Sequence, residues 1–386
     1  MTVRLDLTGL TTRAAQVWGG VRLVPLTRDE PITGLRLHAR AYGDDPGLVE
    51  VGRRTHYVSY IPHGFVATWT DDDTPVAAYG TQLNAHGTSV KRGATGDEPP
   101  AHGMRLRFHR RMARRVDRNR LRFLPLHLAV EGYLALHFGG PEVVWEEWSQ
   151  RAIRRGLSPR VEEAYAGVEV AGLVDALKHF EIHPGQCGVL VYVADALASA
   201  FVVPHPDDYR ALHATLVQDM YGELVHYYAT LATPAPRFDV RLPDDVASLA
   251  DLRAAAAREQ AEWARFHDAT MADGLLGESY ATNRVYRMGD YALSRFLPTF
   301  RLKQENHIGE LITDRDGRTA YLKTFRLSES QIRRGHLLTT LAAHHWHLPT
   351  TATALGVTDA QLGLRLQAAG FGALLREDVL SHYRAG

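Results

Sequence analysis

The segment QCGVLVYVADALASAFVVP (186–204) constrains the fold more than any other part of this 386-residue chain. It holds two continuous apolar runs, rich in valine and alanine, with a short break at Asp195. Runs of this length and composition are typical of strands that are buried on both faces. We therefore predict a buried hairpin here. Cys187 lies in the first run and is expected to be a small buried residue. As the chain's single cysteine, it excludes an internal disulfide.

Strand patterns also fill the first hundred residues. Short β-branched or aromatic runs are separated by Gly, Pro and Asp clusters, as in VRLVPL, GLRLHARAY, THYVSYIPHGFVATWT and VAAYGTQL. Later in the chain, NHIGELITD and TAYLKTF are joined by RDG, which is a hairpin signal. The turn-rich segments 86–103 and 233–245 are the best candidate linkers.

Helical patterns lie between and after these strands. A very basic helix is expected over 105–122, a long helix that opens at Pro206, and further helices over 246–267 and in the last sixty residues. Together the patterns predict an α+β chain. We expect a β-rich N-terminal region (1–100), a mixed α/β body (101–235), a helical segment plus β-hairpin (236–325) and a three-helix, helix-turn-helix-like unit (326–386).

The expected terminal unit is defined by residues that favour the starts and ends of helices. Pro349 suits the first turn of a helix, and Gly356 suits a left-handed turn position. Thr358, followed three residues later by Gln361, forms a capping-box pattern that begins the next helix. On that helix an apolar stripe would pack against the preceding one, with Leu362, Leu366 and Ala369 facing Ala352 and Leu355.

Residues 330–375, with ATALGV followed by LGLRLQAAGF, resemble the helix-turn-helix of the factor-for-inversion-stimulation (Fis-type) regulators. The resemblance implies that the second helix reads DNA. Only Gln361 and Arg365 are suited to base contacts, because the outward face is expected to hold Ala360, Gly363, Leu364 and Gln367. Such a face equally suits docking to a protein. The run HHWH (344–347) is expected to be a partly exposed loop and not a metal site.

The net charge of the chain is zero, but basic and acidic residues are unevenly distributed along it. Residues 101–160 hold 13 Arg and 5 acids, whereas residues 161–300 hold 10 Lys or Arg and 20 acids. The basic helix, with Arg110, Arg111 and Arg114, is suited to phosphates of a nucleic acid or of a nucleotide-like ligand. Alternatively, it is a solvated face, or it faces the acidic region within a monomer or a homo-oligomer. Only 4 of the 44 basic residues are Lys.

The body of the chain carries a second resemblance. GVRLVPL, RLRFLPLHLAVEGYLALHFGG and FEIHPGQCGVLVYVADALASAFVVPHPDDYRALH are similar to bacterial proteins named for their association with ADP-ribosylglycohydrolases and rhodanese-phosphatases. The resemblance implies a link to ADP-ribose and NAD-derived metabolism. It supplies no catalytic residue and no cofactor.

One strand-to-helix junction is the candidate for polar chemistry. His205, Asp207 and Asp208 follow the buried hairpin, and His183 precedes it. These four residues would form the catalytic or metal-binding set of a hydrolase acting on a nucleotide-like or ADP-ribosyl substrate. The alternative is ordinary helix-start chemistry, with Pro206 and the two acids in the first turn. The motifs GxSxG, GxxxxGK[ST] and HExxH are absent from the sequence.

The function expected from these observations is that of a cytoplasmic accessory or regulatory protein. Its body would sense a ligand or partner, and its terminal unit would dock to nucleic acid or protein. No apolar run approaches the roughly 20 residues of a membrane span, and no export signal is expected. The cofactor stays unassigned. The alternatives are the hydrolase described above and an assembly protein that forms homo-oligomers.

Overall fold

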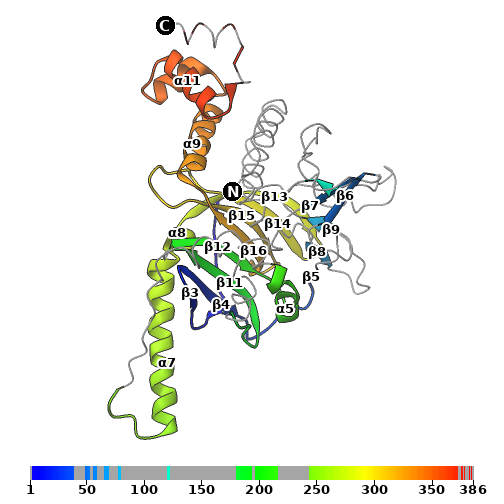
Figure 1. Ribbon diagram of the computed structural model, residues 1–386, viewed down its shortest axis with the longest axis vertical. Coiled ribbons are helices and arrows are strands. Elements are labelled where there is room, and N and C mark those ends of the chain that lie inside the picture. Colours follow the sequence, from blue (N-terminus) through cyan, green and yellow to red (C-terminus); the bar gives the residue numbers. More distant parts are fainter. Residues whose placement is uncertain are drawn as a thin grey trace.

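The structure, a computed structural model, describes residues 2–38, 180–193, 196–215 and 243–372, some residues beyond 372, and short strands at 48–52, 55–58, 65–68, 77–79 and 120–121. Its centre is a ten-stranded antiparallel sheet in the order β1-β13-β14-β15-β16-β12-β11-β4-β2, with β3 paired to β4 (Figure 1). The strands are β1 (Thr2–Arg4), β2 (Thr11–Thr12), β3 (Gln16–Trp18), β4 (Val21–Thr27), β11 (Gln186–Val193), β12 (Ala196–Val202), β13 (Ser279–Met288), β14 (Tyr291–Leu297), β15 (His307–Thr313) and β16 (Thr319–Arg326).

The two edges of this sheet belong to one short segment, which forces the sheet to curl. β1 pairs with β13 at one edge and β2 pairs with β4 at the other. Neighbouring strands lie about 4.8 Å apart, so the path would measure roughly 38 Å if it were flat. The seven Cα–Cα steps from Arg4 to Thr11 reach at most about 25 Å. Asp6 lies over the sheet between them, since its carbonyl accepts a hydrogen bond from Thr319 Oγ1 at 2.7 Å.

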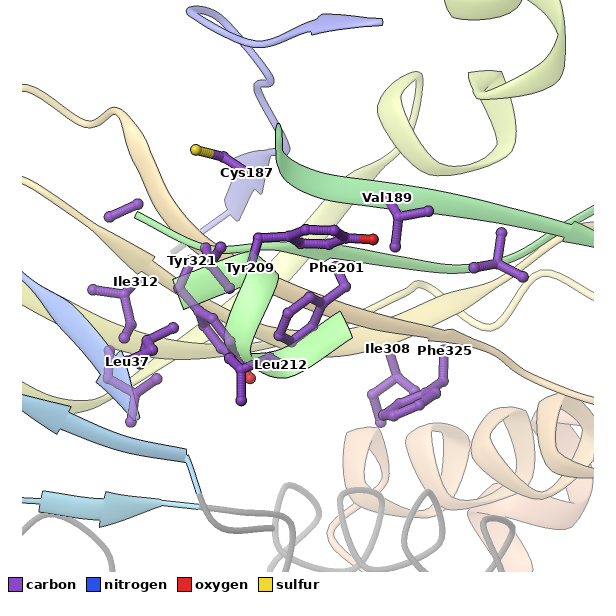
Figure 2. Close-up of a cluster of buried hydrophobic side chains, with 14 of the residues drawn as sticks. Leu37, Cys187, Val189, Phe201, Tyr209, Leu212, Ile308, Ile312, Tyr321 and Phe325 are labelled. Atoms are coloured by element: carbon purple, nitrogen blue, oxygen red, sulfur yellow. The ribbon is translucent and has the colours of Figure 1, made fainter. Parts of the chain in front are cut away.

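Both faces of the sheet are covered by apolar side chains. The concave-face cluster joins Leu5 to strand residues such as Leu190 and Leu322. The convex-face cluster takes side chains from the same strands, including Phe201 and Tyr321, and is covered by helix α5 (Pro206–Thr215). Figure 2 shows Tyr209 and Leu212 of α5 beside these strand residues. The central strands are therefore almost entirely buried, which explains their continuous apolar sequences.

A long helix precedes β13. Helix α7 (Leu249–Phe266) begins at Ser248, whose hydroxyl accepts a hydrogen bond from the backbone of Asp251. It continues into the π-helix η4 (His267–Met271) and the short helix α8 (Asp273–Leu276). Figure 1 shows α7 extending away from the sheet, and Ala255 is its one buried residue. The apolar side chains of η4 and α8 pack in the concave-face cluster, together with Trp263 near the end of α7.

Three helices follow β16: α9 (Glu329–Ala343), α10 (Leu348–Ala354) and α11 (Asp359–Ala368). Helix α9 contributes side chains to two hydrophobic cores. Its Ile332 belongs to the convex-face cluster, whereas Leu337 and Leu341 join Leu362 in a separate terminal cluster. Where α9 meets the sheet domain, Gly335 lies directly against the Phe300 ring and leaves no room for a Cβ atom. The terminal unit is thus fixed to the sheet through α9.

The α+β class predicted from the sequence agrees with this architecture. The predicted hairpins over 186–204 and 306–325 are present as β11–β12 and β15–β16. The β13–β14 hairpin was not predicted. The helix expected over 105–122 is wrong near its end, where Arg120–Leu121 form strand β10, and the rest of that segment lies outside the described residues. The sheet draws strands from 1–100, 101–235 and 236–325, three of the four expected regions.

Short strands from the first hundred residues, together with β10, form two further sheets. One sheet has the order β5-β8-β9 and the other β10-β7-β6, with β10 and β7 parallel. The strands are β5 (Arg36–His38), β6 (Leu48–Gly52), β7 (Thr55–Val58), β8 (Phe65–Thr68) and β9 (Ala77–Tyr79). In the part of the chain that the structure describes, no helix combines the length and apolarity needed to cross a membrane.

Candidate functional site

Asp208, in the first turn of α5, holds this helix to β5. Its carboxylate is 2% exposed and accepts hydrogen bonds from Arg36 Nε at 2.8 Å and from the backbone N–H of Leu37 at 3.0 Å. Arg36 Nη2 also lies 2.7 Å from the same carboxylate. A buried carboxylate with a forked guanidinium partner and a backbone donor is well satisfied. Both oxygens of Asp208 are therefore engaged in holding α5 against β5.

The other members of the predicted His/Asp set lie around the start of the same helix. Asp207 is exposed and pairs with Arg210 at 3.2 Å, and its backbone N–H donates to His205 Nδ1. The backbone N–H of His183 donates to Gln186 Oε1 at 2.9 Å. Within the described ranges, no group of three or more His, Cys, Asp or Glu side chains is arranged to hold a metal ion. The contacts of His205 and Asp207 are local ones at the start of α5, whereas those of Asp208 reach β5.

A second polar group, which sequence reasoning missed, lies under the π-helix. The imidazole of His267 is fully buried and bridges Tyr192 Oη of β11 and the carboxylate of Asp268, with Nδ1 and Oδ1 2.9 Å apart. Burial, reinforced by the charge of Asp268, raises the pKa of Tyr192. The pair therefore anchors η4 to the sheet with a neutral phenol. No periodicity in the sequence reveals the π-helical irregularity at His267, so the sequence held no usable signal for this group.

His307 adds a second buried imidazole on the concave face. Its side chain is fully buried, and Glu305 Oε2 lies 4.0 Å from Nε2. Burial lowers the pKa of His307, and Glu305 opposes this effect. Arg326 pairs with Glu305 at 3.1 Å. A Cβ added at Gly274 would lie 2.5 Å from Glu305 Oε2, so α8 packs directly on this carboxylate. The Glu305–Arg326 ion pair thus joins the segment before β15 to β16, and α8 packs against this pair through Gly274.

The terminal unit has the local structure expected from its sequence. Thr358 and Gln361 form both hydrogen bonds of a capping box at the start of α11. The predicted packing of Leu362 and Leu366 with Ala352 is present in the terminal cluster. One expectation is wrong: Gly363 is buried and does not belong to the outward face. A glycine presents only backbone, so neighbouring side chains can cover it.

The exposed surface of this unit carries few cations. Arg365 and Gln361 are exposed, although Gln361 Oε1 accepts from the Thr358 N–H and is partly committed to the cap. Leu364 is 40% exposed. In the turn before α10, His345 and Trp346 both have positive φ, and Trp346 is 36% exposed. The HHWH run is therefore a mostly exposed turn, as expected. Arg110, Arg111 and Arg114 lie outside the described residues.

The fold and its buried polar groups define an α+β protein built on one curled antiparallel sheet. The ARPP-2 family model matches residues 5–289, most of the chain, and the protein belongs to the ARPP-2 family. This agrees with the family resemblance found in the body sequence. The match ends within the segment joining β13 to β14, so β14 to β16 and the terminal helices follow it. Neither a curated protein nor a solved structure matches the chain.

Proposed function

We propose that the protein is a regulatory or accessory member of its family whose α9–α11 unit is a helix-turn-helix that docks to nucleic acid or protein. The observation that carries the proposal is the division of α9 between two cores. Its first half packs on the sheet and its second half builds the terminal cluster. A docking unit joined to the body by one shared helix moves with the body as a rigid part.

The exposed chemistry of α11 favours weak contact with nucleic acid over strong sequence reading. Arg365 is its one exposed basic side chain, and Asp359 in its first turn carries a charge that phosphate repels. A protein partner would instead use the exposed Leu364. The hydrolase alternative receives less support, because both oxygens of Asp208 already bond Arg36 and Leu37.

The test of docking measures retention of duplex DNA by the full chain as salt is raised. Arg365→Ala is compared with Arg333→Ala, a control on α9 whose exposed side chain pairs with Glu329. If Arg365 contacts phosphate, its loss lowers the slope of log affinity against log salt by about 0.9. The control is expected to leave the slope unchanged. Absence of DNA retention by the wild-type chain would exclude the nucleic-acid branch and leave the protein branch.

Sensing of a ligand by the body is a separate part of the proposal. The family resemblance directs the test to ADP-ribose and NAD, each added to the full chain during thermal unfolding. A ligand at a hundredfold excess over its Kd would stabilise the folded chain by about 2.7 kcal/mol. No shift with either nucleotide would remove the nucleotide-sensing part while leaving the docking part intact.

A further inference from the structure

The concave face holds two fully buried imidazoles that differ in their hydrogen bonds. His267 is bonded at both ring nitrogens, to Tyr192 Oη and to the carboxylate of Asp268. His307, the first residue of β15, is 0% exposed, and neither of its ring nitrogens has a hydrogen-bond partner among the described residues. An unpaired polar group in a protein interior is costly, and native folds rarely keep one. His307 is thus buried without the bonds that hold His267.

Two charged side chains lie beside His307 at the end of the β15–β16 pair. Glu305 Oε2 is 4.0 Å from His307 Nε2, which is within ion-pair range and beyond hydrogen-bond range. The other carboxylate oxygen, Oε1, lies 3.1 Å from Nη2 of Arg326, the residue opposite His307 on β16. The side chains of Glu305 and Arg326 are 33% and 39% exposed, so water reaches them but not the imidazole. We call Glu305, His307 and Arg326 the rim cluster.

Helix α8 covers the rim cluster. A Cβ atom added at Gly274 would lie 2.5 Å from Glu305 Oε2 and 3.1 Å from Glu305 Cβ, so the backbone of α8 rests on this side chain. The helix has only four residues: Leu275 is its one buried side chain, and Asp273, its one charged side chain, is exposed. A short element with few buried side chains opens at a lower free energy than paired strands do. Helix α8 is therefore the part of this site that can move.

Protonation of His307 is the charge change that this site can undergo in mild acid. Burial lowers the pKa of His307; Glu305 opposes this effect and Arg326 adds to it. Glu305 stays ionised, because His307 and Arg326 lower the pKa of its carboxyl group. Burial raises the pKa of both tyrosines of this face, so they stay neutral. The other titratable or charged groups described around this face are Arg22 of β4, Tyr192 of β11, Asp268 of η4, Asp273 of α8, Tyr280 of β13 and the Glu278–Arg301 pair.

We propose that uptake of a proton by His307 in mild acid opens α8 away from the rim cluster. In the closed form the imidazolium would have two N–H donors without an acceptor in hydrogen-bond range, and one carboxylate at 4.0 Å that Arg326 already engages. When α8 moves away, water can bond both N–H groups. The closed form therefore binds the proton less tightly than the open form. It is favoured above the ordinary histidine pKa of about 6.5 and is lost as the pH falls below that value.

Opening of α8 changes what the concave face presents to solvent. Leu275 would leave the concave-face cluster, and apolar side chains of the sheet would meet water. Helix α8 follows η4 directly, and the bond between Tyr192 and His267 keeps η4 on the sheet. The opening is thus confined to the segment between η4 and β13. Because this segment lies outside the terminal unit, failure of the proposal would leave docking by α9–α11 unchanged.

The test follows hydrogen exchange of the full chain by mass spectrometry at about pH 7.5 and about pH 5.5, with each rate corrected for the intrinsic pH dependence of exchange. An open form that binds one proton with a pKa of about 6.5 is favoured about tenfold more at the lower pH than at the higher. We therefore expect the protection of α8 to fall about tenfold, while β11 and β12 keep theirs. His307→Phe, which cannot take up the proton, is expected to remove this fall.

A matched control and the wild-type profile complete the test. His345 is exposed in the HHWH turn, so His345→Gln should leave the fall in α8 unchanged. If His307→Phe fails to fold, His307→Gln replaces it, and the wild-type profile also decides by itself. A fall of less than about twofold in α8, a fall of equal size in β11 and β12, or a fall that persists without His307 overturns the proposal and leaves His307 as a structural core residue.

Discussion

The sheet is stabilised by contacts between residues far apart in the sequence, whereas the terminal three-helix unit is stabilised by contacts between residues close together in the sequence. In the sheet, the hydrogen bond from Thr319 to Asp6 joins residues 313 positions apart, and β11 lies between β4 and β12. In the terminal unit, Thr358 and Gln361 bond each other three positions apart. The sheet therefore depends on contacts that form only when distant segments meet, whereas the terminal helices begin and end on local signals.

The same substitution at two glycines gives the largest expected difference between these regions. In Gly309→Ala, the new Cβ would collide with the backbone carbonyl of Lys323 and lie 2.9 Å from Phe296 Cζ. Since paired strands cannot separate locally, we expect a loss of about 4 kcal/mol or failure to fold. In Gly356→Ala the new Cβ has no atom within 4 Å, and the only cost comes from placing alanine at a φ of 63°. That costs about 1 kcal/mol. Urea unfolding measures both, and equal losses would contradict the comparison.

A cavity in the terminal cluster tests whether that unit unfolds by itself. Leu362 is fully buried there, so Leu362→Ala is expected to cost about 3 kcal/mol. Because the cluster shares only α9 with the sheet, hydrogen exchange should lose its protection in α10 and α11 while β15 and β16 keep theirs. Leu364→Ala, at an exposed position of the same helix, is the control and should change little. Loss of protection in the strands would show that the two regions form one cooperative unit.

What could be predicted from the sequence follows the same distinction between local and long-range contacts. Pro349, Gly356 and Thr358 predicted the terminal helices because their effects act within a few residues. The β11–β12 and β15–β16 hairpins were predictable for the same reason. Their placement beside one another was not, because strand order is decided by long-range packing. The β13–β14 hairpin had a usable local signal in Gly289, which has a φ of 57° in the turn before Asp290.

The candidate sites were less predictable than the fold. The acids at 207 and 208 look alike in the sequence, yet Asp208 is buried against Arg36 while Asp207 is exposed. That difference depends on contacts with β5, where Leu37 lies 171 positions before Asp208, and no local pattern encodes it. Similarly, His267 and Tyr192 are 75 positions apart. Buried polar partnerships of this kind require the tertiary structure.

Lys323 provides a pH test that is specific to the sheet. Its folded-state pKa of about 8 lies below the ordinary value of 10.5, so the unfolded chain binds the proton more tightly. The resulting destabilisation is fully present below about pH 8 and is relieved as the pH rises toward 10.5. Relative to Lys323→Met, whose side chain does not titrate, the free energy of unfolding of the wild type should rise by roughly 2 to 3 kcal/mol over that range. Parallel pH profiles for the two chains would exclude this effect.

The buried hydrogen bond between Tyr192 and His267 is expected to contribute less to the free energy of unfolding than the titration of Lys323 does. Tyr192→Phe removes the hydroxyl and leaves the buried Nε2 of His267 without that partner, at a cost of about 2 kcal/mol. Tyr280→Phe is the matched control: its hydroxyl donates to the Leu275 carbonyl at 2.8 Å, a neutral bond of about 1 kcal/mol. Thermal unfolding of both variants measures the difference. If Tyr280→Phe cost as much as Tyr192→Phe, the imidazole would add nothing to the attachment of η4.

The smallest expected effect concerns the cap of α11. Thr358→Ala removes the hydroxyl that accepts from the Gln361 N–H, and it leaves one backbone donor of the first turn to water. We expect a loss of about 1 kcal/mol that is confined to α10 and α11 in hydrogen exchange. Thr353→Ala is the control, because that hydroxyl bonds the Pro349 carbonyl within α10 and alanine is the better helix former. A loss that extends to the strands of the sheet would mean that the local signals of the terminal unit also stabilise the body.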